Sequence, residues 1–333
     1  MNFNKREIGS TGLLVTELGL GTAAMAGNHR PVAQADARAA IDLGLEAGIS
    51  FADTAPFYGF GRSERHIGDA LRARADYVLS TKAGRLLSPG EGSEAERADW
   101  PVGLPFHPVY DYSYDGVMRS FEDSLQRLGL ARIDILLLHD IGEMTHGEAG
   151  NAIHCPQAMS GGYKALDELR RNGDVRAIGM GVNEKEVCQA AMDHGDWDVF
   201  LLAGRYTLLE QGPMHDLMPA MEKRGMSMIL GGPFNSGILA GGDTWNYGQA
   251  PVDVVERVGK IKAVCAAYSV PLPAAALQFP LGHKLVSSVI PGPRSAAEMQ
   301  GILDWWSLKI PAGLWSDLKA EGAIDVDAPL PGS

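Results

Sequence analysis

Eight short apolar runs recur along this 333-residue chain, and stretches with the spacing of amphipathic helices separate them. The runs, predicted as strands, are 18–22, 50–54, 77–82, 133–139, 177–183, 199–205, 226–232 and 287–292. The predicted helices are 34–47, 63–73, 115–128, 160–172, 184–193, 213–224 and 252–268. Strands that alternate with helices form a parallel sheet, and eight of them close into a barrel. The sequence therefore predicts an α/β fold, a (β/α)8 TIM barrel, as a single domain over residues 1–333.

Three segments fall outside this alternation. Residues 2–17 place Gly9-Ser10-Thr11-Gly12 between two short extended pieces, which predicts an N-terminal β-hairpin that plugs the bottom of the barrel. Residues 84–113 are rich in Pro, Gly and aromatic side chains, and residues 140–160 are rich in Gly, His and Met. We predict both as long irregular loops on the catalytic face, because they follow the third and fourth strands and long loops usually serve function.

Polar side chains come at or just past the ends of three predicted strands. Asp53 and Tyr58 follow the second strand, Lys82 closes the third and His139 closes the fourth. The carboxyl ends of barrel strands surround the active site, so we expect these four side chains to meet. A phenol, with a reference pKa of about 10, is a poor base near neutrality, but an ammonium held by a carboxylate lowers that pKa. The four residues predict a proton-handling site in which Tyr58 is the acid–base residue.

Taken one at a time, the same residues also fit structural roles. Asp53 could cap the following loop, Lys82 could simply leave a strand, and His139 could be a satisfied core histidine. Their joint register favours catalysis. The nearby His146 and the pair His154-Cys155 match no metal-ligand spacing, so no metal site is predicted.

Charge and cysteine usage narrow the class of ligand and the setting. A formal net charge of −12 opposes binding to nucleic acid or an anionic membrane, so the expected partner is a small-molecule substrate. The sequence contains no run of about 18 apolar residues, so no membrane span is predicted. The three cysteines contain no CxxC pair and predict neither a disulfide framework nor a zinc site, which fits a cytoplasmic location. No sequence feature sets an oligomeric state.

Over essentially its whole length the chain resembles the aldo-keto reductases. The resemblance rests on Asp-Thr-Ala-x-x-Tyr-Gly at 53–59, Ser-Thr-Lys at 80–82, Leu-His at 138–139, and the segments 178–183 and 288–292, in the same order and spacing. Further segments are similar to a branch that holds the D-threo-aldose (L-fucose) 1-dehydrogenases, L-galactose dehydrogenases and pyridoxal 4-dehydrogenases; these are 111–120, 204–211 and 232–239.

This resemblance implies an NAD(P)-dependent oxidoreductase. Tyr58 would exchange the proton, Lys82 would supply positive charge, Asp53 would orient Lys82, and His139 would orient the substrate oxygen. The implied cofactor contacts lie near strand ends, at Gly21, Thr22, Asp53, Asn183, Gly232, Pro233, Phe234, Asn235, Ser236, Gly237, Leu239, Pro291, Gly292, Arg294 and Glu298. Two positions depart from the wider family. Ala203 stands where many members carry a carboxamide-binding glutamine, and Gly231 or Gly232 stands where many stack a tyrosine on nicotinamide.

One short segment resembles a dinucleotide-binding motif but lacks the helix that such a motif requires. Residues 19–24, Gly-Leu-Gly-Thr-Ala-Ala, match the GxGxxA pattern that follows a strand in dinucleotide-binding folds. In those folds the last Gly or Ala lies in the first turn of a helix that receives the pyrophosphate. Here Gly27, Asn28 and Pro31 follow, so no helix can begin, and no Tyr-x-x-x-Lys pair is present. The cofactor is therefore expected to bind in the barrel's own manner.

A few polar and aromatic residues indicate the cofactor and the substrate class. Arg294 beside Glu298 favours NAD, with NADP as the alternative, because the carboxylate would repel a 2′-phosphate. The candidate substrate contacts are Met25, Phe57, Trp100, His107, Tyr110 and the 140–160 loop. The leading prediction is oxidation of the C1 hemiacetal of an aldose, such as L-fucose, L-galactose or D-arabinose, to the lactone. Oxidation of pyridoxal to 4-pyridoxolactone is its nearest alternative, NADPH-dependent aldehyde reduction the third, and a non-catalytic barrel that regulates a channel the last.

Overall fold

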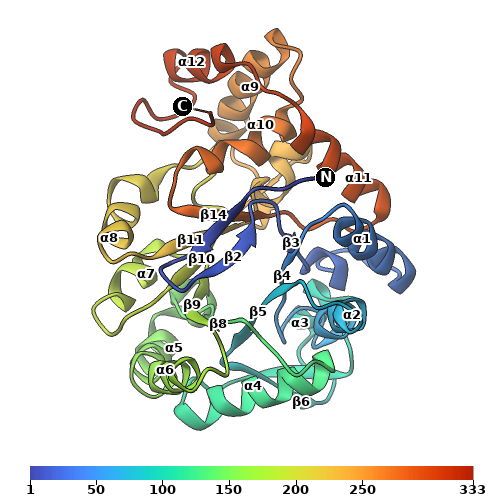
Figure 1. Ribbon diagram of the computed structural model, residues 1–333, viewed down its shortest axis with the longest axis vertical. Helices are drawn as coiled ribbons and strands as arrows, with labels where there is room; N and C mark the ends of the chain where they lie inside the picture. Colours follow the sequence, from blue (N-terminus) through green and yellow to red (C-terminus); the bar gives the residue numbers. More distant parts are fainter. Residues whose placement is uncertain (333) are drawn as a thin grey trace.

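A ring of eight parallel strands forms the centre of the computed structural model, which describes residues 1–332 (Figure 1). In order around the ring the strands are β3 (Leu20–Gly21), β4 (Phe51–Asp53), β5 (Val78–Ala83), β8 (Ile135–His139), β9 (Ala177–Val182), β10 (Val199–Ala203), β11 (Ser227–Gly231) and β14 (Val286–Ile290). The first and last strands meet through a parallel bridge between Leu18 and Val289. Backbone bonds of 2.9 Å from Gly19 N to Val289 O and from Gly21 N to Pro291 O close the ring. The predicted barrel is confirmed.

Helices surround the strands. They are α1 (Gln34–Glu46), α2 (Arg62–Leu71), α4 (Tyr114–Leu128), α6 (Tyr163–Asn172), α7 (Lys185–Ala191), α8 (Leu217–Lys223), α9 (Val252–Ala267), α10 (Leu272–Gln278), α11 (Ala296–Ser307) and α12 (Ala312–Ala320). The first seven of these correspond to the predicted helices. The three that come after α9 were not predicted, and for α10 the reason is that it is buried on most sides and so lacks an amphipathic stripe.

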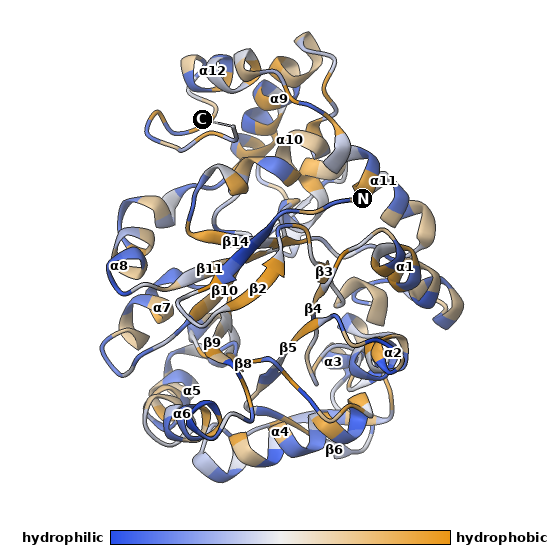
Figure 2. Cartoon of the chain, viewed as in Figure 1, coloured by the Kyte–Doolittle hydropathy of each residue, from blue (hydrophilic) through white to orange (hydrophobic). Residues whose placement is uncertain are grey.

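Two layers of apolar side chains build the core. The outer layer lies between strands and helices and contains most buried residues. Figure 2 shows the strands of the barrel as predominantly hydrophobic, with hydrophilic residues on the helices. The inner layer fills the barrel. It joins three residues of the N-terminal hairpin, β1 (Lys5–Ile8) and β2 (Leu13–Thr16), to the strand interiors: Ile8, Leu13, Val15, Phe51, Val78, Ile135, Leu137, Ala177, Val199, Leu201, Ile229 and Ile290. The hairpin therefore plugs the barrel, as predicted.

The segment after β5 is more regular than predicted. It contains an antiparallel pair, β6 (Arg85–Pro89) with β7 (Phe106–Tyr110), and a short helix, α3 (Glu94–Asp99). Ser93 starts α3 with a capping box, in which its hydroxyl and the Glu96 carboxylate satisfy each other's backbone amides. Proline and glycine marked this segment as a loop, but pairing between its two distant ends outweighs those local signals.

The segment after β8 is also structured. It forms α5 (Glu143–Gln157), which leads through a π-turn, η2 (Ala158–Gly162), into α6. No residue of α5 is buried, and Gly147 breaks its helical geometry with φ 63°. A helix that buries no apolar stripe carries no helical period, so the sequence predicted a loop here.

Close packing at the barrel seam explains the false dinucleotide signal. A Cβ at Gly19 would lie 2.8 Å from side-chain atoms of Phe51 and Ile290, and one at Gly21 would lie 2.7 Å from the Ile290 carbonyl oxygen. Only a single 3-10 turn, η1 (Ala24–Ala26), comes after these glycines, and the next helix, α1, begins at Gln34. Both glycines serve barrel closure.

A similar close approach between α2 and α4 gives a stability prediction. A Cβ at Gly68 would lie 2.0 Å from the Leu128 carbonyl oxygen, which is backbone and cannot swing aside. We expect Gly68→Ala to lower the free energy of unfolding by about 1–3 kcal/mol, measured by urea denaturation. The matched control is Gly259→Ala on α9, where no atom lies within 4 Å of the new Cβ, and it should be neutral or stabilising by about 0.5–1 kcal/mol. Equal effects of the two changes would contradict this prediction.

Residues 1–332 contain no single helix that is long and apolar enough to cross a membrane; α9 together with residues 272–282 passes on length and composition, as a pair bent by 101°. In α9, four residues are buried against the protein: Val254, Val258, Ile261 and Cys265. The same range holds no group of three or more His, Cys, Asp or Glu side chains placed to hold a metal ion.

Candidate active site

A buried ion pair lies at the carboxyl ends of β4 and β5. Lys82 Nζ donates to Asp53 Oδ2 at 2.7 Å and to the Thr54 carbonyl at 2.9 Å. Ser80 Oγ donates to the other Asp53 oxygen, Oδ1, at 2.5 Å. Only 1% of Lys82 and 2% of Asp53 is exposed. Charge-assisted hydrogen bonds hold a pair that is withdrawn from water to this extent, so the ammonium has one defined position.

Tyr58 and His139 lie directly against this pair. Lys82 Nζ is 4.5 Å from the centroid of the Tyr58 ring. The Tyr58 and His139 rings meet edge to face with centroids 5.6 Å apart. His139 is buried, whereas Tyr58 keeps part of its surface accessible. The structure therefore brings the four residues singled out in the sequence to one end of the barrel.

Burial dominates the protonation of this group. It raises the pKa of the Tyr58 phenol above its ordinary value; the Lys82 ammonium opposes this shift and Asp53 adds to it. The predicted direction was wrong, because the sequence counted Lys82 without the desolvation of the phenol. Burial also lowers the pKa of His139 well below its ordinary value, with help from Arg85 and Lys82, so the imidazole is neutral. For Lys82, burial lowers the pKa less than Asp53 and Tyr58 together raise it, so the amine stays charged.

Two charged residues that the sequence analysis missed adjoin His139. Arg85 is 3% exposed, and its Nη2 donates to Asp140 Oδ2 at 2.6 Å. The same oxygen lies 3.3 Å from His139 Nε2, and Asp140 Oδ1 accepts a bond of 3.2 Å from Asn183 Nδ2. Asp140 has φ 46°, a left-handed conformation that aspartate tolerates. Both residues come just after predicted strand ends, and that position is the signal that could have found them.

A short hairpin after β11 reaches over the strand ends. It consists of β12 (Thr244–Trp245) and β13 (Gly248–Gln249), with Tyr247 at φ 66° in the two-residue turn. The Tyr247 hydroxyl donates to Asn183 Oδ1 at 2.9 Å. The predicted carboxamide-binding residue is thus held by a tyrosine 64 positions along the chain, and no local pattern signals this contact.

Three of the five predicted substrate residues form an aromatic wall beside Tyr58, which we define as Phe57, Trp100 and Tyr110. Trp100 stacks on Tyr58 with centroids 5.8 Å apart, and Phe57 meets Trp100 edge to face at 5.6 Å. The guanidinium carbon of Arg85 lies 4.2 Å from the Phe57 ring and 5.6 Å from the Tyr110 ring. Trp100 is only 3% exposed and lies under Tyr58, so the accessible part of the wall is Phe57 and Tyr110, with the Arg85 guanidinium beside both rings.

The other two predicted substrate residues lie in different surroundings. Met25 is 1% exposed and belongs to the main hydrophobic core. His107 pairs with Ser88 in the β6–β7 hairpin, three register positions from the Arg85–Tyr110 pair, which is about 10 Å along a strand. Its ring lies against Gly90.

The predicted cofactor loop, residues 232–239, follows β11 and turns through left-handed backbone. Gly232, Asn235, Ser236 and Gly237 have φ of 58°, 46°, 59° and 109°. Gly232 is exposed, whereas Pro233 and Leu239 are buried and Phe234 packs on Trp305 at 5.9 Å. Successive turns of this kind offer backbone N–H groups to an anion.

Two polar side chains that the sequence assigned to the cofactor are engaged inside the protein. Asn235 is 4% exposed, donates to the Gly204 carbonyl at 3.0 Å and accepts from Thr207 Oγ1 at 2.6 Å. Thr22 is 1% exposed and donates to the Asp53 carbonyl at 2.8 Å. In this structure both side chains therefore form hydrogen bonds within the protein at the ends of the barrel strands.

The sequence is also similar to proteins of known activity. The sequence pattern of the aldo/keto reductase family matches residues 17–321. The chain belongs to the aldo/keto reductase family. Pyridoxal 4-dehydrogenase of Microbacterium luteolum is 43% identical over 96% of this chain and 98% of its own length. D-threo-aldose 1-dehydrogenase of a Pseudomonas species is 36% identical over 93% of this chain and 94% of its own. Both relatives are dehydrogenases, so this chain is an oxidoreductase enzyme of the CH–OH or aldehyde type.

Solved structures give the same fold. An aldo-keto reductase from Bacillus halodurans, in its holo form, superposes with a TM-score of 0.75 and 24% identity, and the match covers 96% of each chain. At this identity the likeness speaks for the barrel architecture alone.

The part of this aldo/keto reductase predicted to meet the adenosine end lies where β14 gives way to α11. Glu298 Oε2 accepts from the Arg294 backbone amide at 2.7 Å, and Ser295 Oγ caps α11 by accepting from the Glu298 amide at 3.2 Å. Glu298 Oε1 also accepts from Arg30 Nη2 at 3.2 Å, a contact across 268 positions that the sequence did not reveal. Arg294 Nε is buried and has no partner in the part of the chain that the structure describes. Pro291 and Gly292 form the exit from β14.

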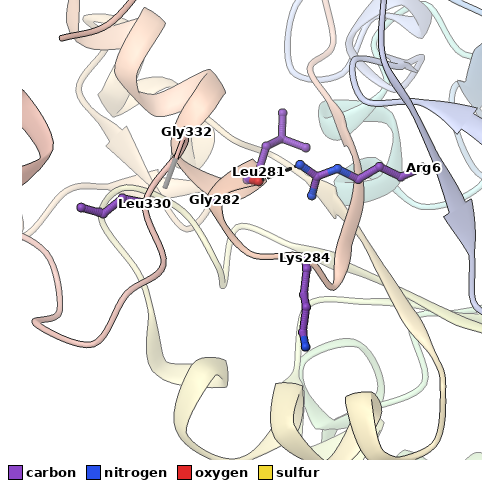
Figure 3. Close-up of a pocket in the computed structure, with 6 residues that line it drawn as sticks. All are labelled: Arg6, Leu281, Gly282, Lys284, Leu330 and Gly332. Atoms are coloured by element: carbon purple, nitrogen blue, oxygen red, sulfur yellow. Dashed lines mark hydrogen bonds between the residues drawn. The ribbon is translucent and has the colours of Figure 1, made fainter. Parts of the chain in front are cut away.

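Two cavities of this barrel lie away from Tyr58. One is lined by Arg6, Leu281, Gly282, Lys284, Leu330 and Gly332, and in it the Arg6 guanidinium donates to the Leu281 carbonyl at 2.8 Å (Figure 3). The other, of about 560 Å³, lies between residues 238–243 and 255–273. Neither contains a residue of the four-residue set, so neither is the substrate pocket.

Proposed function

We propose that this aldo/keto reductase oxidises a cyclic hemiacetal to a lactone, with NAD as hydride acceptor and Tyr58 as the acid–base residue. The observation that carries the proposal is the placement of Tyr58 and His139 against the buried Lys82–Asp53 pair at the carboxyl end of the barrel. A phenol, a fixed ammonium and a neutral imidazole suit proton transfer from an alcohol carbon that loses hydride.

The residues around the site fit a nicotinamide dinucleotide. Arg294 Nε is a buried donor without a partner among residues 1–332, and Gly232 provides an exposed left-handed turn where the backbone is open to a ligand. We propose that Asn183 holds the carboxamide after Tyr247 releases its oxygen, that residues 232–239 hold the pyrophosphate through backbone groups, and that Arg294 meets the adenosine end. Bound NAD would supply the hydride acceptor.

The protein's own groups would act on the proton. Tyr58, as phenolate, would take the proton of the hemiacetal hydroxyl while hydride leaves the same carbon. Lys82 would stabilise the phenolate, and Asp53 and Ser80 would keep Lys82 in place. Neutral His139 would hydrogen-bond the substrate oxygen and set its angle.

Two substrates fit this mechanism. An aldose hemiacetal, such as that of L-fucose, L-galactose or D-arabinose, is supported by the 36% identity to D-threo-aldose 1-dehydrogenase. Pyridoxal, which also forms an internal hemiacetal, is supported by the 43% identity to pyridoxal 4-dehydrogenase. The test is NADH formation by the purified protein with NAD and each of L-fucose, L-galactose, D-arabinose and pyridoxal. Turnover of at least one is expected, and silence on all four, with both NAD and NADP, would refute the proposal.

The raised pKa of Tyr58 sets the direction of the pH dependence. Oxidation needs the phenolate, and burial keeps the phenol protonated up to and beyond its ordinary pKa of about 10. We therefore expect kcat/KM for oxidation to rise about tenfold per pH unit from pH 7 to 9, and the rate of the reverse reduction to stay level. The rates of NADH formation and of NADH consumption, followed at matched ionic strength, measure the two directions. A plateau in oxidation below pH 8 would contradict the dominance of burial.

The cofactor preference rests on Glu298. Its carboxylate would repel a 2′-phosphate, and without it Arg30 and Arg294 would present two cations. We expect Glu298→Gln to lower the ratio of kcat/KM for NAD to that for NADP by about tenfold, equal to about 1.4 kcal/mol. The control is Asp304→Asn, also on α11, whose exposed carboxylate contacts Gln300. An unchanged ratio in Glu298→Gln would remove the argument for NAD.

Two broader proposals rest on the sequence. A single domain over residues 1–333 is supported by the continuous strand–helix alternation, and a cytoplasmic location by the number and spacing of the cysteines.

A further inference from the structure

A turn that only glycine fits brings Arg85 into the site. Gly84, between β5 and β6, has φ 96°, and a Cβ there would lie 2.2 Å from the Tyr112 ring. The Arg85 side chain, three residues after Lys82, is almost wholly covered.

The Arg85 guanidinium is only partly satisfied within the protein. Nη2 donates to Asp140 Oδ2 at 2.6 Å and lies 3.4 Å from Thr145 Oγ1. Nε is buried and has no acceptor among residues 1–332. Buried donors without a partner are rare, and each calls for an explanation. In an active site, the simplest one is that the donor serves the substrate.

Arg85 and His139 lie next to each other along the aromatic wall. Both contact the same oxygen, Asp140 Oδ2, at 2.6 Å and 3.3 Å. Both also pack on Phe57, the guanidinium carbon at 4.2 Å from the ring centroid and the imidazole centroid at 6.2 Å. A substrate whose reacting oxygen is held by Tyr58 and His139 therefore has the guanidinium beside it.

We propose that Arg85 selects the substrate by binding an anionic oxygen carried close to the reacting carbon, which makes a 3-hydroxypyridine hemiacetal such as that of pyridoxal the preferred class over a neutral aldose. The inference rests on the proposed function, because it concerns the same hemiacetal site. In pyridoxal the phenol oxygen sits on the ring atom next to the one that bears the oxidised carbon. An aldose offers only neutral hydroxyls there. A guanidinium attracts an ionised oxygen through opposite full charges as well as through the hydrogen bond, and a neutral hydroxyl offers only the hydrogen bond, so the anion gains most.

The aromatic wall fits the same class. Phe57 and Tyr110 are partly exposed aromatic rings beside the guanidinium, and rings of this kind favour a flat pyridine ring as a partner. Asp140 is the one carboxylate paired with Arg85 in the described part of the chain. The substrate oxygen would therefore be the second anion on a guanidinium that has donors to spare.

The experiment is a double-mutant cycle in which one change is made in Arg85 and the other in the 3-hydroxyl group of the substrate. Wild type and Arg85→Met are assayed with pyridoxal and with 3-deoxypyridoxal, in which hydrogen replaces the 3-hydroxyl. We expect wild type to prefer pyridoxal in kcat/KM by about 100-fold and Arg85→Met to prefer it by less than about fivefold. Intrinsic differences in reactivity between the two substrates cancel, because both enzymes see the same pair. Arg85→Lys, which keeps the charge without the planar fork, should fall between them.

Controls separate substrate recognition from a loss of structure. Arg119→Met, at an exposed arginine of α4 that pairs with Asp123, should behave as wild type. If Arg85→Met folds poorly, the double variant Arg85→Met/Asp140→Asn replaces it, because it also removes the carboxylate left without a partner. It too should prefer pyridoxal over 3-deoxypyridoxal by less than about fivefold. All variants are first checked for thermal unfolding and for quenching of protein fluorescence by NADH.

The outcomes distinguish this inference from the function on which it rests. If wild type and Arg85→Met both oxidise pyridoxal and prefer it over 3-deoxypyridoxal by the same factor, the inference is overturned and the hemiacetal oxidation still stands. Turnover of aldoses without pyridoxal overturns it as well. Absence of turnover with every hemiacetal refutes the proposed function itself.

Discussion

Replacing Tyr58 with phenylalanine is expected to lower kcat for hemiacetal oxidation by about 10²–10⁴-fold. The change removes one oxygen, the proton acceptor, and leaves a ring that still stacks on Trp100, at the 5.8 Å that separates the two centroids, and that still meets His139. NAD binding should therefore persist, because no predicted cofactor contact is altered. Single-turnover measurements separate the chemical step from binding and release.

A matched control tests whether any tyrosine hydroxyl would have this effect. Tyr268 donates to Asp317 at 2.7 Å in an exposed contact, so Tyr268→Phe should leave turnover unchanged. Turnover of Tyr58→Phe within about twofold of wild type would exclude the phenol as the proton acceptor. Loss of NAD binding in Tyr58→Phe would instead show that the hydroxyl supports the cofactor site.

Lys82→Met is expected to remove turnover and to lower the free energy of unfolding by about 3–5 kcal/mol. The substitution leaves the Asp53 carboxylate 2% exposed with only the Ser80 hydroxyl as a side-chain donor. A buried charge without its partner costs far more than the pair contributes. Urea denaturation measures the stability, and NADH formation measures the turnover.

The double variant Lys82→Met/Asp53→Asn separates the two effects. Asparagine removes the charge and can still accept from Ser80, so most of the lost stability should return while turnover stays absent. The surface control is Lys185→Met, whose ammonium meets Asp216 at 2.5 Å with both side chains partly exposed, and it should cost less than about 1 kcal/mol. If Lys82→Met were as stable as wild type, this result would contradict the burial of the Lys82–Asp53 pair away from water.

The fold was predictable because its signals are local. Apolar runs such as 135–139 and 177–182 are short, continuous and flanked by helical periods, and a strand buried on both faces reads the same wherever it lies in the barrel. Prediction failed where pairing partners are distant or where no stripe is buried. Arg85 faces Tyr110 across the β6–β7 hairpin, and the exposed helix α5 buries no residue, so neither segment carried a local period.

The site divides in the same way. Asp53, Lys82 and His139 could be placed together because each ends a parallel strand, and parallel strands bring their carboxyl ends to one side. Asp140 and Arg85 follow predicted strand ends, but they were missed because the ion pair that gives them a role joins residues 55 positions apart in the sequence. The direction of the Tyr58 pKa shift was also out of reach, since it depends on how far the folded chain removes the phenol from water.

By itself, the sequence determined the strand–helix order, the barrel and the four side chains at its carboxyl end. These features come from hydrophobic periodicity and from the position of a residue along its own strand. Only the tertiary structure decided the contacts of Tyr247 with Asn183, of Arg30 with Glu298 and of Arg85 with Asp140. The physical reason is that burial, charge pairing and unpaired donors are properties of neighbours that meet only when the barrel closes.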